Sequence, residues 1–75
     1  MPKPPRVSGK DTIRALERLG FLQIRQQGSH IILKKQTPNG EIGCVVPLHR
    51  ELALGTLKSI LKQAGIDLNE FIKNL

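Results

Sequence analysis

The chain has 75 residues, of which 39% are hydrophobic and 24% charged, and its formal net charge at pH 7 is +6. A chain of this length forms one domain that buries only about 60–65% of its unfolded surface, so we expect a shallow site and no deep cofactor cavity. No apolar run is long enough to span a bilayer, and the basic residues near the start are not followed by the apolar core of a signal peptide. We therefore expect a cytoplasmic protein.

The positive charge is unevenly distributed along the chain. Residues 1–10 and 21–50 each carry a net charge of +3, whereas the remaining segments are neutral. Such a distribution suits a polyanionic partner such as nucleic acid, although it equally suits simple solubility. The single cysteine, Cys44, excludes an internal disulfide and a multi-cysteine zinc site, and its apolar neighbours favour a buried thiol over a reactive one.

The first predicted elements are a tail and a helix. Residues 1–7 are rich in proline, and we expect them to be extended and mobile. Ser8 is typical of a helix N-cap, with Asp11 as the acidic partner in a capping box. Apolar residues at helical spacing then predict an amphipathic helix that ends at Gly20.

Three strands are predicted next. Alternating residues indicate strands over residues 21–25, 29–35 and 41–47. Residues 26–28 form the first expected turn. The sequence Thr-Pro-Asn-Gly at 37–40 is a strong turn signal, which predicts that the second and third strands form a hairpin.

Two helices complete the predicted order. Gly55 would weaken a helix interior, so the second helix is predicted to begin at about Thr56 and to end at Gly65. Asp67 and Glu70 resemble a second capping box, which opens a short last helix.

Together these elements predict one α+β domain over residues 1–75. Its α-β-β-β-α order forms a three-stranded antiparallel sheet with helices on one face, followed by a short C-terminal helix. Alternation along the second strand turns Ile31 and Leu33 toward the core, and His30 and Lys34 toward the open face.

His30 is the candidate for proton-transfer chemistry, because it follows Gly28 at the start of a strand on the open face. A histidine can take a proton from a ribose 2′-hydroxyl, which then attacks the adjacent phosphate. Lys34 or Arg25 could stabilise the charge that develops on the phosphate oxygens. RNA carries its own nucleophile, so this reaction needs neither a metal nor a deep pocket. By position alone, however, a strand-end histidine more often only hydrogen-bonds the turn.

His49 is a second candidate, in the connection before the second helix and beside Arg50. It could act as a second acid or bind phosphate near the helix N-terminus, although such a residue is more often a solvated loop histidine. No carboxylates at ligand spacing accompany the two histidines, so we expect no metal and no cofactor. Phe21 and Phe71 are expected in the core, which leaves no aromatic surface for stacking single-stranded RNA.

Three blocks of the sequence form a recognisable pattern. The first block is Ser-Gly-Lys at 8–10, opening a helix that ends in Leu-Gly-Phe at 19–21. The second is Gly-Ser-His at 28–30. The third comprises residues 46–52 and 55–66, and its length makes it the most specific. In these blocks the sequence resembles the HicA toxins, a family of small ribonucleases that cleave messenger RNA.

This resemblance implies a fold like that of double-stranded-RNA-binding domains, and a type II toxin that cleaves mRNA without a metal. It also implies that His30 is the catalytic histidine and that a HicB-type antitoxin blocks the active face. The residues that assist His30 are not identified by it; the candidates for RNA binding are Gly28, Ser29, Arg25, Lys34, Lys35, His49 and Arg50. The alternatives are a module that binds duplex RNA by shape without cutting it, and an inactive chain that only holds its antitoxin.

Overall fold

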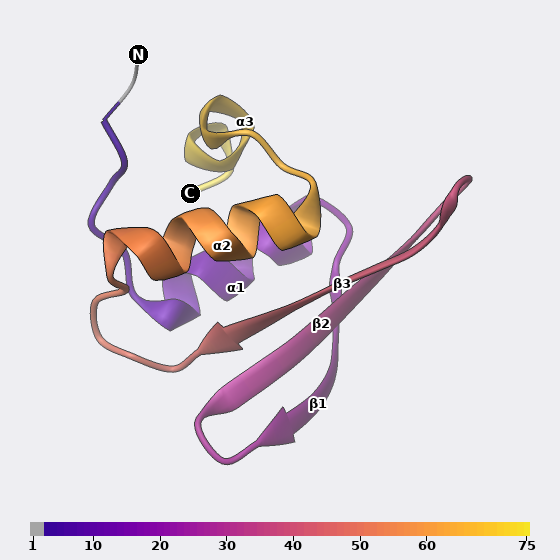
Figure 1. Ribbon diagram of the computed structural model, residues 1–75, viewed down its shortest axis with the longest axis horizontal. Coiled ribbons are helices and arrows are strands. Elements are labelled where there is room, and N and C mark those ends of the chain that lie inside the picture. The colour runs from indigo at the N-terminus through magenta and orange to yellow at the C-terminus, as the bar shows by residue number, and fades with distance from the viewer. Residues whose placement is uncertain (1–2) are drawn as a thin grey trace.

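The structure, a computed structural model, describes residues 3–75, and its elements follow the predicted order (Figure 1). They are α1 (Gly9–Arg18), β1 (Leu22–Gln27), β2 (His30–Thr37), β3 (Gly40–Pro47), α2 (Leu54–Ala64) and α3 (Leu68–Lys73). The strands form one antiparallel sheet in the order β1-β2-β3. Figure 1 shows α1 and α2 on one face of this sheet, so the predicted α+β class and layer arrangement are confirmed.

The first helix begins as its capping residues predict. The Ser8 hydroxyl accepts a hydrogen bond from the Asp11 N–H (3.0 Å), and the Asp11 carboxylate accepts one from the Ser8 N–H (3.3 Å). This reciprocal pair satisfies two of the backbone donors that a helix start leaves free. Helix α1 ends at Arg18, and Gly20 follows at φ +100, a backbone conformation that favours glycine.

The two faces of the sheet differ in burial because side chains alternate along each strand. On the helix side, Ile31 and Leu33 of β2 lie beside Val46 and Cys44 of β3, and all four are buried. On the other side lie His30 and the residues that alternate with it. The predicted facing of β2, with His30 on the open side, is confirmed.

The first turn lies further along the chain than the sequence predicted. Strand β1 continues to Gln27, because Gln26 and Gln27 pair with Ile31 and His30 in the ladder. The turn therefore falls at residues 28–29 rather than 26–28, and Gly28 adopts a positive φ of 57 there. Pairing with β2 thus decides where β1 ends.

The start of α2 was also predicted too late. The helix begins at Leu54 and not at Thr56, after Ala53, whose side chain makes no capping hydrogen bond. The Ala53 carbonyl accepts from the Leu57 N–H (2.9 Å), and Leu57 is buried in the core. Gly55 therefore lies in the first turn, where packing of the following residues offsets its low helix propensity.

Several predictions about the core are confirmed. Phe21, Phe71 and Cys44 are all buried, Phe71 completely. Val7, at the end of the proline-rich segment, is also buried, and its carbonyl accepts from the Leu52 N–H (2.8 Å). Residues 1–2 lie outside the described residues, and the mobility of the tail remains a prediction. Within residues 3–75, no helix is long and apolar enough to cross a membrane.

Candidate functional site

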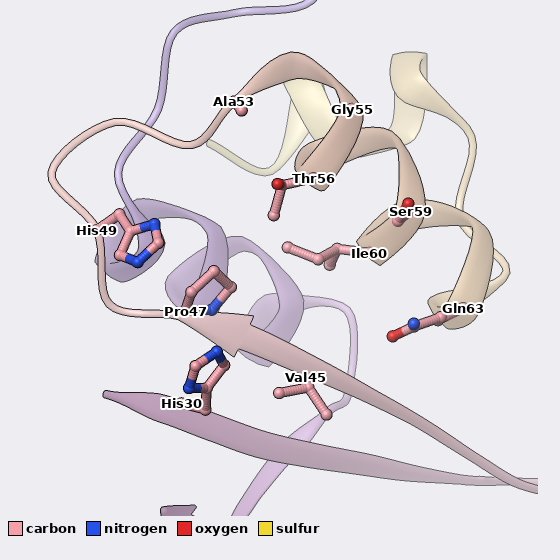
Figure 2. Close-up of a pocket in the computed structure, with 10 residues that line it drawn as sticks. All are labelled: His30, Val45, Pro47, His49, Ala53, Gly55, Thr56, Ser59, Ile60 and Gln63. Carbon is pink, nitrogen blue, oxygen red and sulfur yellow. The ribbon is translucent and has the colours of Figure 1, made fainter. Parts of the chain in front are cut away.

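A groove of about 780 Å³ lies where α2 passes the β3 edge of the sheet (Figure 2). Strands β2 and β3 line one side of it, the loop that follows β3 lines another, and α2 lines the third. The lining residues are His30, Val45, Pro47, His49, Ala53, Gly55, Thr56, Ser59, Ile60 and Gln63. The groove contains both histidines of the chain, although 18 residues separate them in the sequence.

His30 is the first residue of β2, and its position is set by pairing on both sides. Its Cα partner in β1 is Gln27 and its partner in β3 is Pro47, so its imidazole projects from the open face. The residue is exposed. Figure 2 shows the ring directed into the groove, toward Pro47. An imidazole in this position can exchange protons with a ligand lying along the sheet.

His49 lies in the loop between β3 and α2, but two backbone hydrogen bonds restrain that loop. The Leu48 N–H donates to the Ser29 carbonyl (2.7 Å), and the His49 carbonyl accepts from the Gly9 N–H (2.9 Å). The residue itself is exposed, and its ring lines the groove. His49 is therefore a loop residue with a fixed backbone and a side chain that a ligand can reach.

Gly28 and Ser29 serve the site through the backbone. Gly28 forms the turn into β2 with its positive φ, and its carbonyl accepts from the Gln26 side-chain amide (2.9 Å). The Ser29 carbonyl holds the loop of His49 through the bond from Leu48. The Gly-Ser-His turn thus joins the strand that carries His30 to the loop that carries His49.

The basic candidates are divided between the two faces of the sheet. Arg25 is exposed and pairs with Ile32, which puts it on the same face as His30. Lys35 lies on the opposite face, with its ammonium group 5.8 Å from the centre of the Phe21 ring, a cation–π contact. Arg50 is exposed in the loop directly after His49. Arg25 thus shares the face of His30 and Arg50 directly follows a residue of the groove, whereas Lys35 lies on the opposite face.

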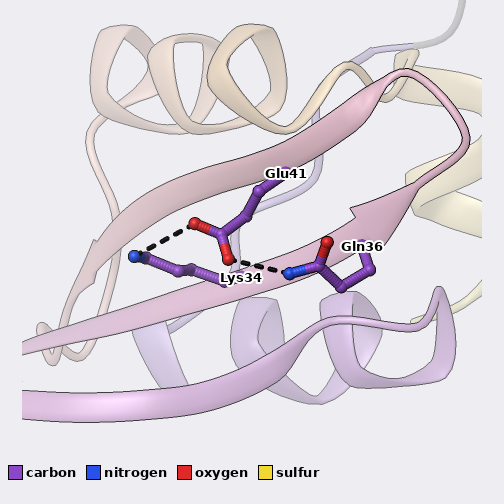
Figure 3. A network of polar contacts seen from close by, with 3 residues as sticks. All are labelled: Lys34, Gln36 and Glu41. Carbon is purple, nitrogen blue, oxygen red and sulfur yellow. Dashed lines mark hydrogen bonds and ion pairs between the residues drawn. The ribbon is translucent and has the colours of Figure 1, made fainter.

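Lys34 shares the open face with His30, but it has an acidic neighbour. Its ammonium group lies 3.2 Å from the Glu41 carboxylate, which also accepts a hydrogen bond from the Gln36 amide (2.8 Å; Figure 3). Both charged side chains are about half exposed, so the pair contributes little to stability, about 0–1 kcal/mol. Glu41 does, however, offset the positive charge that Lys34 offers to a polyanion.

The groove is also lined by three polar residues of α2, Thr56, Ser59 and Gln63. The sequence analysis did not single out these residues as ligand-binding. Figure 2 shows them along the side of α2 that borders the groove. Their i, i+3 and i+7 spacing, next to the buried stripe of the helix, was a sequence signal for one polar helix face. It did not indicate that this face would meet the strand of His30.

No metal site accompanies the groove. Within residues 3–75, no group of three or more His, Cys, Asp or Glu side chains lies together in a way that could hold an ion. The thiol of Cys44 lies on the core side of the sheet, where burial raises its pKa to about 11. A thiol in that state is a poor nucleophile, and Cys44 is not among the residues that line the groove.

Comparisons with known proteins assign the family. A family model described as "HicA toxin of bacterial toxin-antitoxin" matches residues 9–66, which include every element from α1 to α2 and all ten residues of the groove. The comparison with curated proteins gave no match. Because the matched region covers well over half of the 75 residues, the chain belongs to the HicA toxin family of bacterial toxin–antitoxin systems.

Proposed function

We propose that this toxin is a metal-independent endoribonuclease that cleaves mRNA, with His30 as its general base. The observation that carries the proposal is the exposed imidazole of His30 in the groove of a chain that belongs to a toxin family. A shallow groove suits a polymer substrate, because the phosphodiester of RNA is accessible along a surface and need not enter a closed cavity.

The chemistry follows from the substrate. His30 removes the proton from a ribose 2′-hydroxyl, and the oxygen then attacks the adjacent phosphorus. The bond from phosphorus to the 5′-oxygen of the next nucleotide breaks, which yields a 2′,3′-cyclic phosphate and a 5′-hydroxyl. Arg25 is the cation of the open face best able to stabilise the phosphate oxygens, because Lys34 is partly neutralised by Glu41.

RNA binding in this proposal depends on charge and on α2. The net charge of +6 attracts the phosphate backbone, and Arg50 extends the basic surface past His49. The hydroxyls of Thr56 and Ser59 and the amide of Gln63 can donate to phosphate or sugar oxygens along the groove. No phenylalanine, tyrosine or tryptophan lines the groove, so this mode of binding does not depend on stacking bases on those rings.

A toxin of this kind has an antitoxin partner. We expect a HicB-type protein that covers the groove and so prevents RNA from reaching His30. Its contact surface should be acidic, because it must match the basic face of the toxin.

The test of the proposal compares the wild type with His30→Ala and Gln23→Ala. Gln23 is an exposed residue whose β2 partner, Leu33, is buried, so the control lies away from the open face. In buffer with EDTA, wild type and Gln23→Ala should cut RNA and leave cyclic phosphate ends, whereas His30→Ala should lose about 10²–10⁴-fold in rate. Induced expression should arrest growth for the first two only.

Other outcomes would reject specific parts of the proposal. Full activity of His30→Ala would exclude His30 as the base, and loss of cutting in EDTA would exclude the metal-free mechanism. RNA that the wild type retards on a gel but leaves intact would instead identify a binding module, and that retention should fall steeply with salt.

A further inference from the structure

The mechanism above leaves one proton unassigned. When the 2′-oxygen attacks phosphorus, the departing 5′-oxygen leaves as an alkoxide unless an acid protonates it. Alkoxides are poor leaving groups, so a general acid on that side accelerates the reaction by about 10²–10⁴-fold. A ribonuclease with His30 as its base therefore needs a second group that holds a proton near neutral pH.

The lining of the groove offers one such group. Of its ten residues, only His30 and His49 have side chains of a type that gives or takes a proton near neutral pH. The hydroxyls of Thr56 and Ser59 hold their protons too tightly. No carboxylate, lysine or arginine belongs to the lining of this groove. His49 is thus the one residue of the lining, besides the base, that can act as the acid.

The backbone holds the two histidines in a fixed relation. The Leu48 N–H donates to the Ser29 carbonyl (2.7 Å), so the residue before His49 is bonded to the residue before His30. Figure 2 shows Pro47 between the two rings. In an in-line displacement the attacking and leaving oxygens lie on opposite sides of phosphorus. Two imidazoles on either side of Pro47 can serve those two oxygens.

We propose that His49 is a catalytic residue, the general acid that protonates the 5′-oxygen as it leaves; this role rests on the proposed ribonuclease activity of His30. The proton of the 2′-hydroxyl passes to neutral His30, the 2′-oxygen–phosphorus bond forms, and the phosphorus–5′-oxygen bond breaks. Protonated His49 gives its proton to the 5′-oxygen. His30 ends protonated and His49 neutral, and both return to their starting states by exchange with water.

This role differs from phosphate binding, the other function that the sequence suggested for His49. A phosphate-binding histidine contributes to the affinity for every RNA, whatever its leaving group. A general acid contributes only where the leaving group needs a proton. The two roles are therefore separated by changing the leaving atom.

The experiment uses RNA in which sulfur replaces the 5′-bridging oxygen at one linkage, because a thiolate leaves without protonation. On ordinary RNA, we expect His49→Ala and His30→Ala each to lose about 10²–10⁴-fold in cleavage rate. On the sulfur-bridged RNA, His49→Ala should cleave at close to the wild-type rate, whereas His30→Ala should remain defective. His49→Gln, which keeps a polar side chain but cannot transfer the proton, should behave like His49→Ala and replaces it if the alanine variant fails to fold.

Each other outcome counts against the proposal. Equal losses by His49→Ala on both substrates would assign His49 to phosphate binding or to structure, and full activity on ordinary RNA would remove it from the reaction. In both cases a defective His30→Ala would leave the proposed function standing. If the wild type cleaved neither substrate, the proposed function would be overturned together with the role of His49.

Discussion

The backbone N–H of Gly9 donates to the carbonyl oxygen of His49 over 2.9 Å, so the first residue of α1 holds the loop that lines one side of the groove. A side chain at Gly9 has no space, because a Cβ there would overlap the carbonyl oxygen of Pro47. The glycine is required by this close approach of two backbones, and the position of His49 depends on it.

Gly9→Ala should therefore destabilise the protein by about 1–3 kcal/mol, the usual cost of an added methyl in a packed site. It should also lower RNA cleavage, because α1 and the loop of His49 must move apart. Urea unfolding measures the first effect and a cleavage assay at saturating RNA the second. The matched control for stability is Gly55→Ala, where a Cβ meets nothing within 4 Å and alanine should stabilise α2 by about 0.5–1 kcal/mol. Equal effects of the two substitutions would contradict the close approach.

Asp11 should make the stability depend on pH in the acid range. Hydrogen bonds from the Ser8 backbone N–H and then from its hydroxyl hold the pKa of the Asp11 carboxyl below its ordinary value of 3.8. A carboxyl with a lower pKa in the folded state stabilises the fold above its unfolded pKa, and this contribution is lost as the pH falls through the folded pKa. Asp11→Asn should thus be less stable than the wild type at neutral pH, and the difference should shrink below about pH 4.

Chemical denaturation of the two proteins at several pH values measures this difference. Glu17→Gln, at an exposed position of the same helix but away from its cap, is the control for the loss of one negative charge. A constant difference between wild type and Asp11→Asn across the acid range would show that the capping box carries no such linkage.

The thiol of Cys44 should react slowly with thiol reagents in the native protein. Burial raises its pKa to about 11, so little thiolate exists at pH 8, and the side chain is only 3% exposed. We expect labelling by a disulfide reagent to be limited by opening of the fold and to become fast in denaturant. Asn39→Cys in a Cys44→Ala background puts a thiol in an exposed turn and should react at once. Equally fast labelling of native Cys44 would contradict its burial.

Glu41→Gln should strengthen RNA binding, because it frees the ammonium group of Lys34 on the open face. We expect tighter binding at low salt and a steeper salt dependence, by about one phosphate contact. Stability should change by less than about 1 kcal/mol. Binding titrations at several salt concentrations measure both the affinity and the slope.

Glu70→Gln is the matched control, because it changes the net charge by the same amount and lies in α3, outside the sheet that carries Lys34. The two variants would behave alike if only the net charge mattered. In that case Lys34 would have no direct part in binding RNA.

The fold was largely predictable, since its signals are local. Ser8 and Asp11 form the capping box that their spacing predicts, and Asp67 caps α3 through the Glu70 N–H (2.8 Å). Alternation in β2 correctly separated the buried Ile31 from the exposed His30. The errors occurred at element ends, such as Gln27 of β1, where pairing partners and packing decide the boundary.

The site was predictable only in part. The sequence indicated His30 and His49 separately, each from its neighbours and from the family pattern. It gave no sign that Thr56, Ser59 and Gln63 line the same groove, because that depends on how α2 passes β3. It also kept both Lys34 and Lys35 as candidates for RNA binding, whereas the structure pairs Lys34 with Glu41 and places the ammonium group of Lys35 over Phe21.

The sequence by itself determined the elements, the exposed side of β2 and the family pattern, because caps, turns and alternation act between residues close in the chain. Only the tertiary structure decided that the two imidazoles share one groove. That meeting requires the hydrogen bond between Leu48 and Ser29 and the close approach of Gly9 to the loop. Both are contacts between segments distant in sequence, which no local pattern specifies.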